Sequence, residues 1–448
     1  MSLFGTDGAR GIANAEMTPE LALSVGLATG TCLPRPATVL VGRDTRVSGP
    51  MLEAALSAGL AASGVEVLSA GLIPTPALAH LIPSYGAAAG IMISASHNPP
   101  AYNGIKLLSE DGGKWDPAVE AAVEAAVAQR RWTLAEPVAV GNIVSVAEEA
   151  LARYRDHLVG LFRGQVAPVR VVVDLAWGAA VATVPAVLEA LGVQVEAIHA
   201  LPRGRWINQG CGATHPEALS RAVVERGADV GLAFDGDADR LIAVDHRGRV
   251  VDGDGLLYLL TKGWIRRGEL GVRRVVATVM ANLGLEQALA RIGVALVRTP
   301  VGDRWVAQAL KDSGSDLGGE QSGHIILRRW AETGDGLLTA LAVLREMAWS
   351  GRSLAELVEG FEPFPQVLRN LTIPPEYRDW RAIPGLAEAV AAAEAALGQE
   401  GRVLVRRSGT EPLLRVMVEG RDAVATTAWA DRLAAVVEAA VGPARAPS

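Results

Sequence analysis

Ala87-Ala-Ala-Gly-Ile-Met-Ile-Ser-Ala-Ser-His-Asn-Pro-Pro100 is an apolar run followed at once by a polar loop. The run from Ala87 to Ile93 predicts a buried strand, and the two prolines prevent a helix from following directly. Ser96 is therefore expected on a loop at a strand end, where its hydroxyl can carry a phosphoryl group. Serine is a weak nucleophile until a base or a metal activates it, so an ordinary polar turn capped by Asn98 fits this stretch equally well.

The whole chain has 448 residues, and 50% of them are hydrophobic, which predicts about three or four domains. A net charge of −7 argues against nucleic acid or an anionic membrane as a partner. The two cysteines, Cys32 and Cys211, do not suggest a disulfide framework. The N-terminus does not resemble a signal peptide, and no apolar run reaches the ~20 residues that span a bilayer. We therefore expect a cytoplasmic protein.

A strand–loop–helix–strand pattern occurs three times along the chain. Its copies begin with strands at residues 39–41, 169–173 and 274–279, and in each copy a Gly-Val pair follows the helix. Glycine is the usual residue after a helix C-terminus, and strand–helix–strand units pair in parallel through right-handed crossovers. The repetition therefore predicts three related α/β domains with mixed sheets.

Each copy continues through a second helix into a polar loop. The three loops contain Ser96, then Asp235 to Arg240, then Gly319 to His324. Because α/β sheets bind ligands at the carboxyl ends of their parallel strands, we expect the loops to converge on one central cleft. Beyond Pro365, two Ala-rich helices near residues 386–397 and 423–441 predict a smaller α+β C-terminal domain. The expected domains are 1–149, 150–250, 251–364 and 365–448.

The second loop has the composition of a metal site. Asp235, Asp237 and Asp239 alternate with small residues, so the backbone can aim three carboxylates at one point. Carboxylates at that spacing repel one another, and a bound cation relieves the repulsion. Oxygen ligands favour Mg²⁺ or Ca²⁺ over zinc. Arg240 stands where an EF-hand needs glycine, so an EF-hand is excluded and an acidic surface turn is the alternative.

Two further loops can bind a sugar phosphate. Glu320, Ser322 and His324 could hydrogen-bond sugar hydroxyls, although His324 is alternatively a buried structural histidine. The segment 406–412 offers arginine, hydroxyl and glycine N–H groups to a phosphate, and a plain basic turn is its alternative. A serine, a magnesium site, a hydroxyl-binding loop and a phosphate site together fit phosphoryl transfer on a sugar phosphate.

At this point the chain resembles the α-D-phosphohexomutases over essentially its whole length. The motifs that carry the resemblance are Phe4-Gly-Thr-Asp-Gly-Ala-Arg10-Gly, Ser94-Ala-Ser-His-Asn-Pro99, Asn103-Gly-Ile-Lys106, Asp235-Gly-Asp-Ala-Asp-Arg240, Gly319-Glu-Gln-Ser-Gly-His324 and Arg406-Arg-Ser-Gly-Thr-Glu-Pro412. The resemblance implies a phosphate on Ser96 in the active enzyme, one Mg²⁺ per active site, and hexose 1,6-bisphosphate as intermediate and activator. It implies small sugar phosphates as partners and leaves a homodimer open.

The resemblance also implies a role for each motif residue. Magnesium would be held by a phosphoserine oxygen on Ser96 and by Asp235, Asp237 and Asp239. Arg10 and Lys106 would be the acid/base pair, with His97 and Arg240 supporting the charge. Sugar hydroxyls would contact Glu320, Ser322 and His324. The phosphate that does not react would be bound by Arg406, Ser408, Gly409, Thr410 and Arg415. Lys106 could act as a base only if its pKa fell well below the ~10.4 of free lysine.

Gln321 and Val301-Gly-Asp-Arg304 resemble the family members that interconvert glucosamine 6-phosphate and glucosamine 1-phosphate, an amino-sugar precursor of UDP-N-acetylglucosamine and of the cell wall. The alternatives are a mutase for glucose or mannose phosphates, a Mg²⁺-dependent sugar phosphatase, and an inactive sugar-phosphate-binding protein. The intact motifs disfavour the inactive protein, and the fourth domain disfavours the phosphatase. Tyr102, Trp177 and Trp305 depart from the usual family pattern.

Overall fold

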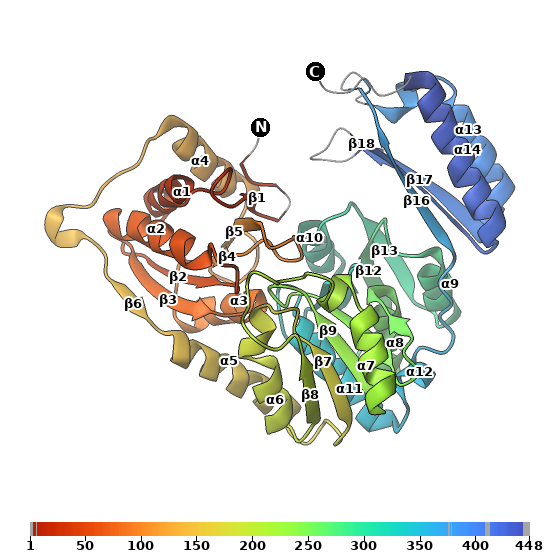
Figure 1. Ribbon diagram of the computed structural model, residues 1–448, viewed down its shortest axis with the longest axis horizontal. Coiled ribbons are helices and arrows are strands. Elements are labelled where there is room, and N and C mark those ends of the chain that lie inside the picture. The colour runs from red at the N-terminus through yellow and green to blue at the C-terminus, as the bar shows by residue number, and fades with distance from the viewer. Residues whose placement is uncertain (1–2, 6, 375–376, 378, 408–412, 442–448) are drawn as a thin grey trace. The chain divides into compact units, whose positions relative to one another are not determined.

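The computed structural model describes residues 3–5, 7–374, 377, 379–407 and 413–441 (Figure 1). The chain divides into two compact units, Met1–Met280 with Val294–Glu359 and Ala281–Gly293 with Gly360–Ser448. Among the described residues, no helix combines the length and apolar character that crossing a membrane requires.

The first sheet has the strand order β1-β5-β4-β2-β3-β6. Its strands are β1 (Ala9–Ile12), β2 (Thr38–Arg43), β3 (Glu66–Leu72), β4 (Ala89–Ile93), β5 (Tyr102–Leu108) and β6 (Ile143–Ser145). The helices around it are α1 (Pro19–Cys32), α2 (Gly49–Ala62), α3 (Thr75–Ser84), α4 (Pro117–Gln129) and α5 (Ala147–Phe162). All of β4 is buried, as the apolar run predicts.

The close approach of α1 and α2 depends on glycine. A Cβ atom on Gly26 would lie 2.2 Å from the Leu56 carbonyl oxygen, and one on Gly59 would lie 2.4 Å from the Leu23 carbonyl oxygen. Leu52, Leu56 and Leu60 of α2 then pack with the buried side chains of one face of the sheet. This packing holds β2 and β4 so that the loops at their carboxyl ends lie side by side.

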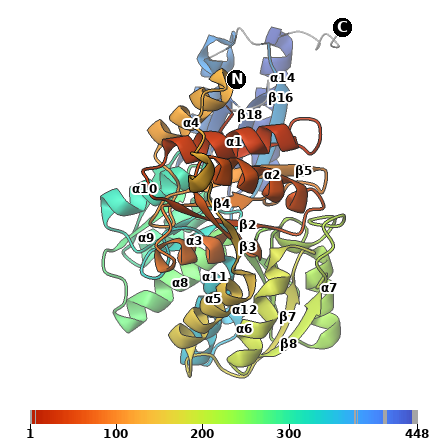
Figure 2. The same ribbon diagram turned by 90° about the vertical axis from the view of Figure 1, so that its left-hand side faces the viewer.

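The second sheet has the order β11-β10-β9-β7-β8, and the third has the order β13-β12-β14-β15. The second contains β7 (Arg170–Asp174), β8 (Gln194–Ile198), β9 (Val230–Phe234), β10 (Leu241–Asp245) and β11 (Val250–Val251), with α6 (Val184–Ala190) and α7 (Glu217–Arg226). The third contains β12 (Arg274–Thr278), β13 (Ala295–Thr299), β14 (Leu317–Gly319) and β15 (Ile325–Leu327), with α8 (Gly253–Arg267), α10 (Asp303–Ser313), α11 (Gly336–Ser350) and α12 (Leu354–Leu357). Helix α7 contacts β7 and β9, and Figure 2 shows it beside β7.

The three sheets share one plan. In each, the first strand of the repeat pairs in parallel with the next two: β2 with β3 and β4, β7 with β8 and β9, β12 with β13 and β14. The third parallel strand is then followed by an antiparallel neighbour, β5, β10 or β15. The predicted parallel repeats and the mixed-sheet α/β class are confirmed. Each polar loop of the sequence lies at the turn from the third parallel strand to its antiparallel neighbour.

The second unit is the smaller α+β part. It contains α9 (Leu283–Arg291) and the antiparallel sheet β16-β18-β17, formed by β16 (Gln366–Thr372), β17 (Gly401–Arg407) and β18 (Leu413–Gly420). Helices α13 (Leu386–Leu397) and α14 (Ala423–Val441) pack on this sheet. Both helices occupy the predicted ranges, whereas β16 was not predicted. Ser408, Gly409 and Thr410 of the predicted phosphate loop lie outside the described residues.

Candidate active site

Ser96 is fully buried at the carboxyl end of β4. Its Oγ donates a 2.6 Å hydrogen bond to Asp235 Oδ2 and lies 3.4 Å from His97 Nδ1. The Ser96 backbone has φ = 48°, in the left-handed region that residues other than glycine rarely adopt. Such a conformation persists only when the surroundings hold it, and it is frequent at reactive sites.

Arg46 supplies much of that support. Its side chain is fully buried and donates hydrogen bonds to the carbonyl oxygens of Ser96 (2.9 Å), Asn98 (2.8 Å), Pro99 (2.6 Å) and Tyr102 (2.8 Å). Its Nε lies 3.0 Å from Asp44 Oδ2, so the buried charge is paired. The guanidinium therefore holds the backbone of the loop that contains Ser96. Sequence analysis did not identify Arg46 as part of the site.

Three buried carboxylates lie beside the serine. Oxygen atoms of Asp235, Asp237 and Asp239 lie within 4.8 Å of one another. Burial, and then the charges of Asp239 and Asp237, raise the pKa of Asp235 well above its ordinary value. Asp237 Oδ1 is buried and makes no hydrogen bond to a described residue. An all-oxygen cluster with mutual repulsion and an unsatisfied carboxylate oxygen fits a hard divalent cation such as Mg²⁺.

Lys106 connects the carboxylates to the N-terminal loop. Its Nζ lies 2.8 Å from Asp237 Oδ2, 3.3 Å from Asp239 Oδ2 and 3.2 Å from Asp7 Oδ2. Burial alone would lower the pKa of Lys106, but Asp237, Asp7 and Asp239 together raise it well above its ordinary value. This is opposite to the shift that a base requires, so in these surroundings Lys106 is a cation that holds or donates a proton.

The side chains near Ser96 and Asp235 also include Arg10, Arg240 and His97. Arg10 Nη1 donates a 2.9 Å hydrogen bond to Asn98 Oδ1, and Arg240 Nε lies 4.0 Å from Asp235 Oδ2. Burial, followed by the charges of Arg240 and Arg10, lowers the pKa of His97 to about 3. The ring is therefore neutral in these surroundings, and its part in supporting charge stays a prediction. The two guanidinium groups supply the positive charge.

The three predicted sugar-binding residues of the third loop have different surroundings. Glu320 Oε1 accepts a 3.2 Å hydrogen bond from the Gly302 N–H, and Ser322 is exposed. His324 is buried, with Nδ1 3.7 Å from Asp239 Oδ1 and Nε2 accepting a 3.2 Å bond from the Gly334 N–H. His324 therefore connects the aspartate loop to the segment before α11, and its contact with a sugar hydroxyl stays a prediction.

A second group of ionic contacts joins the first and third sheets. Lys114 Nζ bonds to Asp7 Oδ1 (2.9 Å) and to Asp303 Oδ1, and Arg304 Nη2 bonds to Glu120 Oε2 (2.6 Å). Sequence analysis did not identify Lys114. The scarcity of lysine, which occurs four times in this arginine-rich chain, was the available signal. A cavity of about 650 Å³ is lined by Lys114, Asp303 and His324, among others, and offers space next to these groups.

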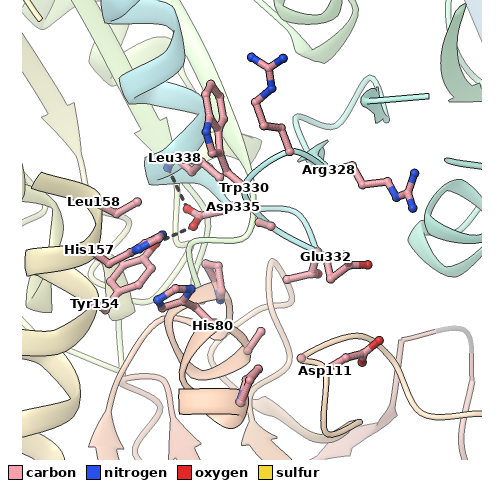
Figure 3. Close-up of a pocket in the computed structure, with 17 residues that line it drawn as sticks. His80, Asp111, Tyr154, His157, Leu158, Arg328, Trp330, Glu332, Asp335 and Leu338 are labelled. Atoms are coloured by element: carbon pink, nitrogen blue, oxygen red, sulfur yellow. Dashed lines mark hydrogen bonds between the residues drawn. The ribbon is translucent and has the colours of Figure 1, made fainter. Parts of the chain in front are cut away.

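A separate cavity of about 240 Å³ lies beside α3, α5 and the segment 328–335 (Figure 3). The rings of His80 and His157 stack there at 3.9 Å, and Tyr154 Oη donates a 2.6 Å bond to Asp335 Oδ2. None of the residues that line this cavity belongs to the predicted site. We therefore treat it as distinct from the candidate active site.

Comparisons with known proteins show the family to which the chain belongs. Family models described as phosphoglucomutase/phosphomannomutase match in four segments: alpha/beta/alpha domain I over residues 1–133, domain II over 152–248, domain III over 252–364 and the C-terminal domain over 368–436. The chain therefore has the four-domain architecture and belongs to the phosphoglucomutase/phosphomannomutase family, whose members are phosphohexomutases.

Within that family, similar curated relatives are phosphoglucosamine mutases. The protein of this name from Rhodococcus jostii is 48% identical over 441 residues, covering 97% of this chain and 99% of its own. The one from Synechococcus elongatus is 46% identical over 452 residues, covering 97% and 94%. A crystal structure of a phosphoglucomutase/phosphomannomutase family protein from Burkholderia thailandensis has a TM-score of 0.82 at 25% identity, covering 98% of this chain and 97% of its own.

Proposed function

We propose that the protein interconverts glucosamine 6-phosphate and glucosamine 1-phosphate through a phosphorylated Ser96 and a 1,6-bisphosphate. The observation that carries this proposal is the 2.6 Å hydrogen bond between Ser96 Oγ and Asp235, inside a buried cluster of three carboxylates and two guanidinium groups. The amino sugar is supported by the phosphoglucosamine mutases at 46–48% identity. The product would supply precursor for UDP-N-acetylglucosamine.

The reaction balances as two phosphoryl transfers. In the first, a substrate hydroxyl oxygen attacks phosphorus, the bond from phosphorus to the Ser96 oxygen breaks, and one proton passes in net from the substrate hydroxyl to the Ser96 oxygen. In the second, the Ser96 oxygen attacks the phosphorus at the other end of the bisphosphate, the bond from that phosphorus to the sugar oxygen breaks, and one proton passes in net from Ser96 to the sugar oxygen. Lys106, which is held protonated, can donate to the leaving oxygen, while Arg10 and Arg240 offset negative charge at the transferring group.

Asp235, Asp237 and Asp239 would hold one Mg²⁺ together with an oxygen of the phosphorylated serine. When bound there, the ion supplies positive charge next to the transferring phosphoryl group. The chain itself positions the serine through Arg46 and supplies the polar groups around the sugar through Glu320. His324 contributes by holding Asp239 and the loop before α11.

Arg406 and Arg415 would bind the phosphate that does not react. They are register partners on β17 and β18, so their side chains leave the same face of the sheet. Burial, and then the charge of Arg415, lower the pKa of Arg406. Two like charges at paired positions favour an anion between them. Ser408, Gly409 and Thr410, assigned by the family resemblance, would complete this site.

The test compares Ser96→Ala with Ser84→Ala, which changes an exposed hydroxyl at the C-terminal end of α3. Wild type and Ser84→Ala should carry a phosphate adduct by intact mass and should interconvert the glucosamine phosphates, and Ser96→Ala should do neither. Full activity in Ser96→Ala would overturn the mechanism. A higher kcat/KM for glucose or mannose 1-phosphate would assign the protein to the rival mutases, and release of inorganic phosphate as the main product would assign it to the phosphatases.

A further inference from the structure

A second cluster of ligand-type side chains lies in the same sheet as the aspartate cluster. Asp174 ends β7, and Asp235 follows the end of the neighbouring strand β9 (Figure 1). The two strands pair in parallel with Asp174 opposite Ala233. His199 follows β8 on the other side of β7, and Cys211 lies on the long connection from β8 to α7. The topology therefore brings the three side chains to the end of one strand.

Their geometry is compact. One ligand atom of Asp174, one of His199 and the Cys211 sulfur all lie within 4.8 Å of one another. His199 Nδ1 is 3.0 Å from Asp174 Oδ1, and the carboxylate also accepts bonds from the N–H groups of Ala176 (3.0 Å) and Gly212 (2.9 Å). Asp174 and Cys211 are fully buried, whereas the His199 side chain is 24% exposed. The cluster is thus oriented by the backbone and open to solvent on one side.

We propose that Asp174, His199 and Cys211 form a second metal site, which binds Zn²⁺ or a similar borderline transition metal. A tetrahedral ion with bonds of ~2.0–2.3 Å places its ligands roughly 3.3–3.7 Å apart. The three ligand atoms here lie within 4.8 Å of one another, which is compatible with that separation. Sulfur, nitrogen and oxygen donors favour such metals, whereas the all-oxygen aspartate cluster favours Mg²⁺. The exposed side leaves room for water as a fourth ligand. Binding displaces the thiol proton and the proton that His199 shares with Asp174.

The same three residue types also occur in nucleophilic cysteine triads, and the structure disfavours that role. Burial, followed by the charge of Asp174, raises the pKa of the Cys211 thiol to about 12. A cysteine nucleophile reacts as the thiolate and needs the opposite shift. A bound divalent cation, by contrast, deprotonates a coordinating thiol outright.

An ion bound to these three residues would stabilise the two segments that contact the loop of Ser96 and its neighbour, the loop of Thr45. Asn208, three residues before Cys211, donates to the carbonyl oxygens of Ser96 (2.8 Å) and Asn98 (3.1 Å). Trp177, three residues after Asp174, packs edge-on against the His199 ring, and its carbonyl accepts a 2.7 Å bond from Thr45 Oγ1. The site therefore ties together two segments that hold the serine loop, and its role is structural.

Cobalt is a suitable probe, because thiolate-bound Co²⁺ gives a sulfur-to-metal charge-transfer band and tetrahedral d–d bands. The titration is done on the full chain in excess Mg²⁺, which occupies the all-oxygen cluster. Wild type and Cys32→Ser, which changes the other cysteine, should show the thiolate band at one Co²⁺ per chain. Cys211→Ser should lose the band, and His199→Asn should weaken binding by at least roughly a hundredfold, the upper end of what losing even an outer partner costs.

Zn²⁺ gives the second readout. It should raise the melting temperature of wild type and of Cys32→Ser but not that of Cys211→Ser, whose mutase activity without zinc should match wild type. A wild-type protein with no thiolate band, or a band that persists in Cys211→Ser, would overturn the site. Mutase activity is measured on the same samples, so a failure of this proposal is distinguishable from a failure of the proposed function.

Discussion

Arg46 Nη2 lies 2.9 Å from the backbone carbonyl oxygen of Ser96, which makes a fully buried arginine a direct neighbour of the proposed phosphoryl carrier. One guanidinium satisfies four carbonyl groups of the turn from β4 to β5 and one carboxylate. The left-handed conformation of Ser96 is kept by these bonds and by Asn208. The position of Ser96 thus depends on a buried side chain that bonds to the backbone of its loop.

Arg46→Lys should therefore impair both stability and catalysis. Lysine keeps the charge next to Asp44, but a single ammonium cannot reach the four carbonyls that the planar fork reaches. We expect a loss of about 3 kcal/mol in the free energy of unfolding by urea denaturation, and a fall in kcat with little change in KM. Arg43→Lys, at the end of β2 and paired with Glu53 at a partly exposed position, is the control and should stay near wild type.

Magnesium should stabilise the protein, because it relieves repulsion within the aspartate cluster. Addition of Mg²⁺ is expected to raise the melting temperature of wild type and to raise it far less in Asp237→Asn, which lacks one of the three charges. The variant should lose activity at low Mg²⁺ and recover part of it at high Mg²⁺. Equal melting shifts in the two proteins would show that the cluster does not bind the ion.

Asp335 should make stability depend on pH. Burial raises the pKa of this carboxyl to about 6, and its oxygens accept bonds from Tyr154 Oη and the Leu338 N–H. Because the folded state then holds the proton more tightly than the unfolded chain, the added stability is complete below pH 3.8 and is lost as the pH rises through about 6.

Asp335→Asn removes this titration while keeping a cap for α11. The stability of wild type relative to Asp335→Asn should therefore fall by on the order of 3 kcal/mol between pH 4 and pH 7, as measured by denaturant unfolding. Tyr154→Phe, which removes a donor to the carboxylate, should steepen the loss. A difference between wild type and Asp335→Asn that stays constant over this range would contradict the prediction.

Arg406→Ala should weaken binding of the non-reacting phosphate. Losing a charge-assisted hydrogen bond costs about 1.5–3 kcal/mol, so KM should rise roughly ten- to a hundredfold. The bisphosphate should also escape more often, which leaves unphosphorylated enzyme, so activity should decay during turnover and recover with added hexose 1,6-bisphosphate. Arg407→Ala is the matched control, since its side chain leaves the other face of β17. Single-turnover release equal to that of wild type in Arg406→Ala would exclude this role.

The repeat, the buried strand β4 and helices α13 and α14 could be predicted because their signals are local: apolar runs, Gly-Val pairs and alanine-rich periodicity. The three aspartates could be predicted because their spacing is itself the signal. β16 was missed because its sequence, Gln-Val-Leu-Arg-Asn-Leu-Thr, does not alternate strictly between apolar and polar residues, although its burial alternates from Leu368 to Thr372.

The remaining site depends on contacts between distant segments. Arg46 meets carbonyls about fifty residues away, and Lys114 meets Asp303 across 189 residues. A sequence without known partners shows only that such residues are polar. The rise of the Lys106 pKa likewise depends on Asp237, Asp7 and Asp239, which only the fold brings together.

The turns that follow β4, β9 and β14 each join two strands that pair with one another, so the strand pairing sets where each turn begins and ends. The residues between those two points are not part of the strand pairing. Gln321 and Ser322 lie on the third turn, apart from Ser96 on the first turn and the three aspartates on the second. We therefore expect substitutions on the third turn to change the sugar preference without displacing the residues predicted to transfer the phosphoryl group.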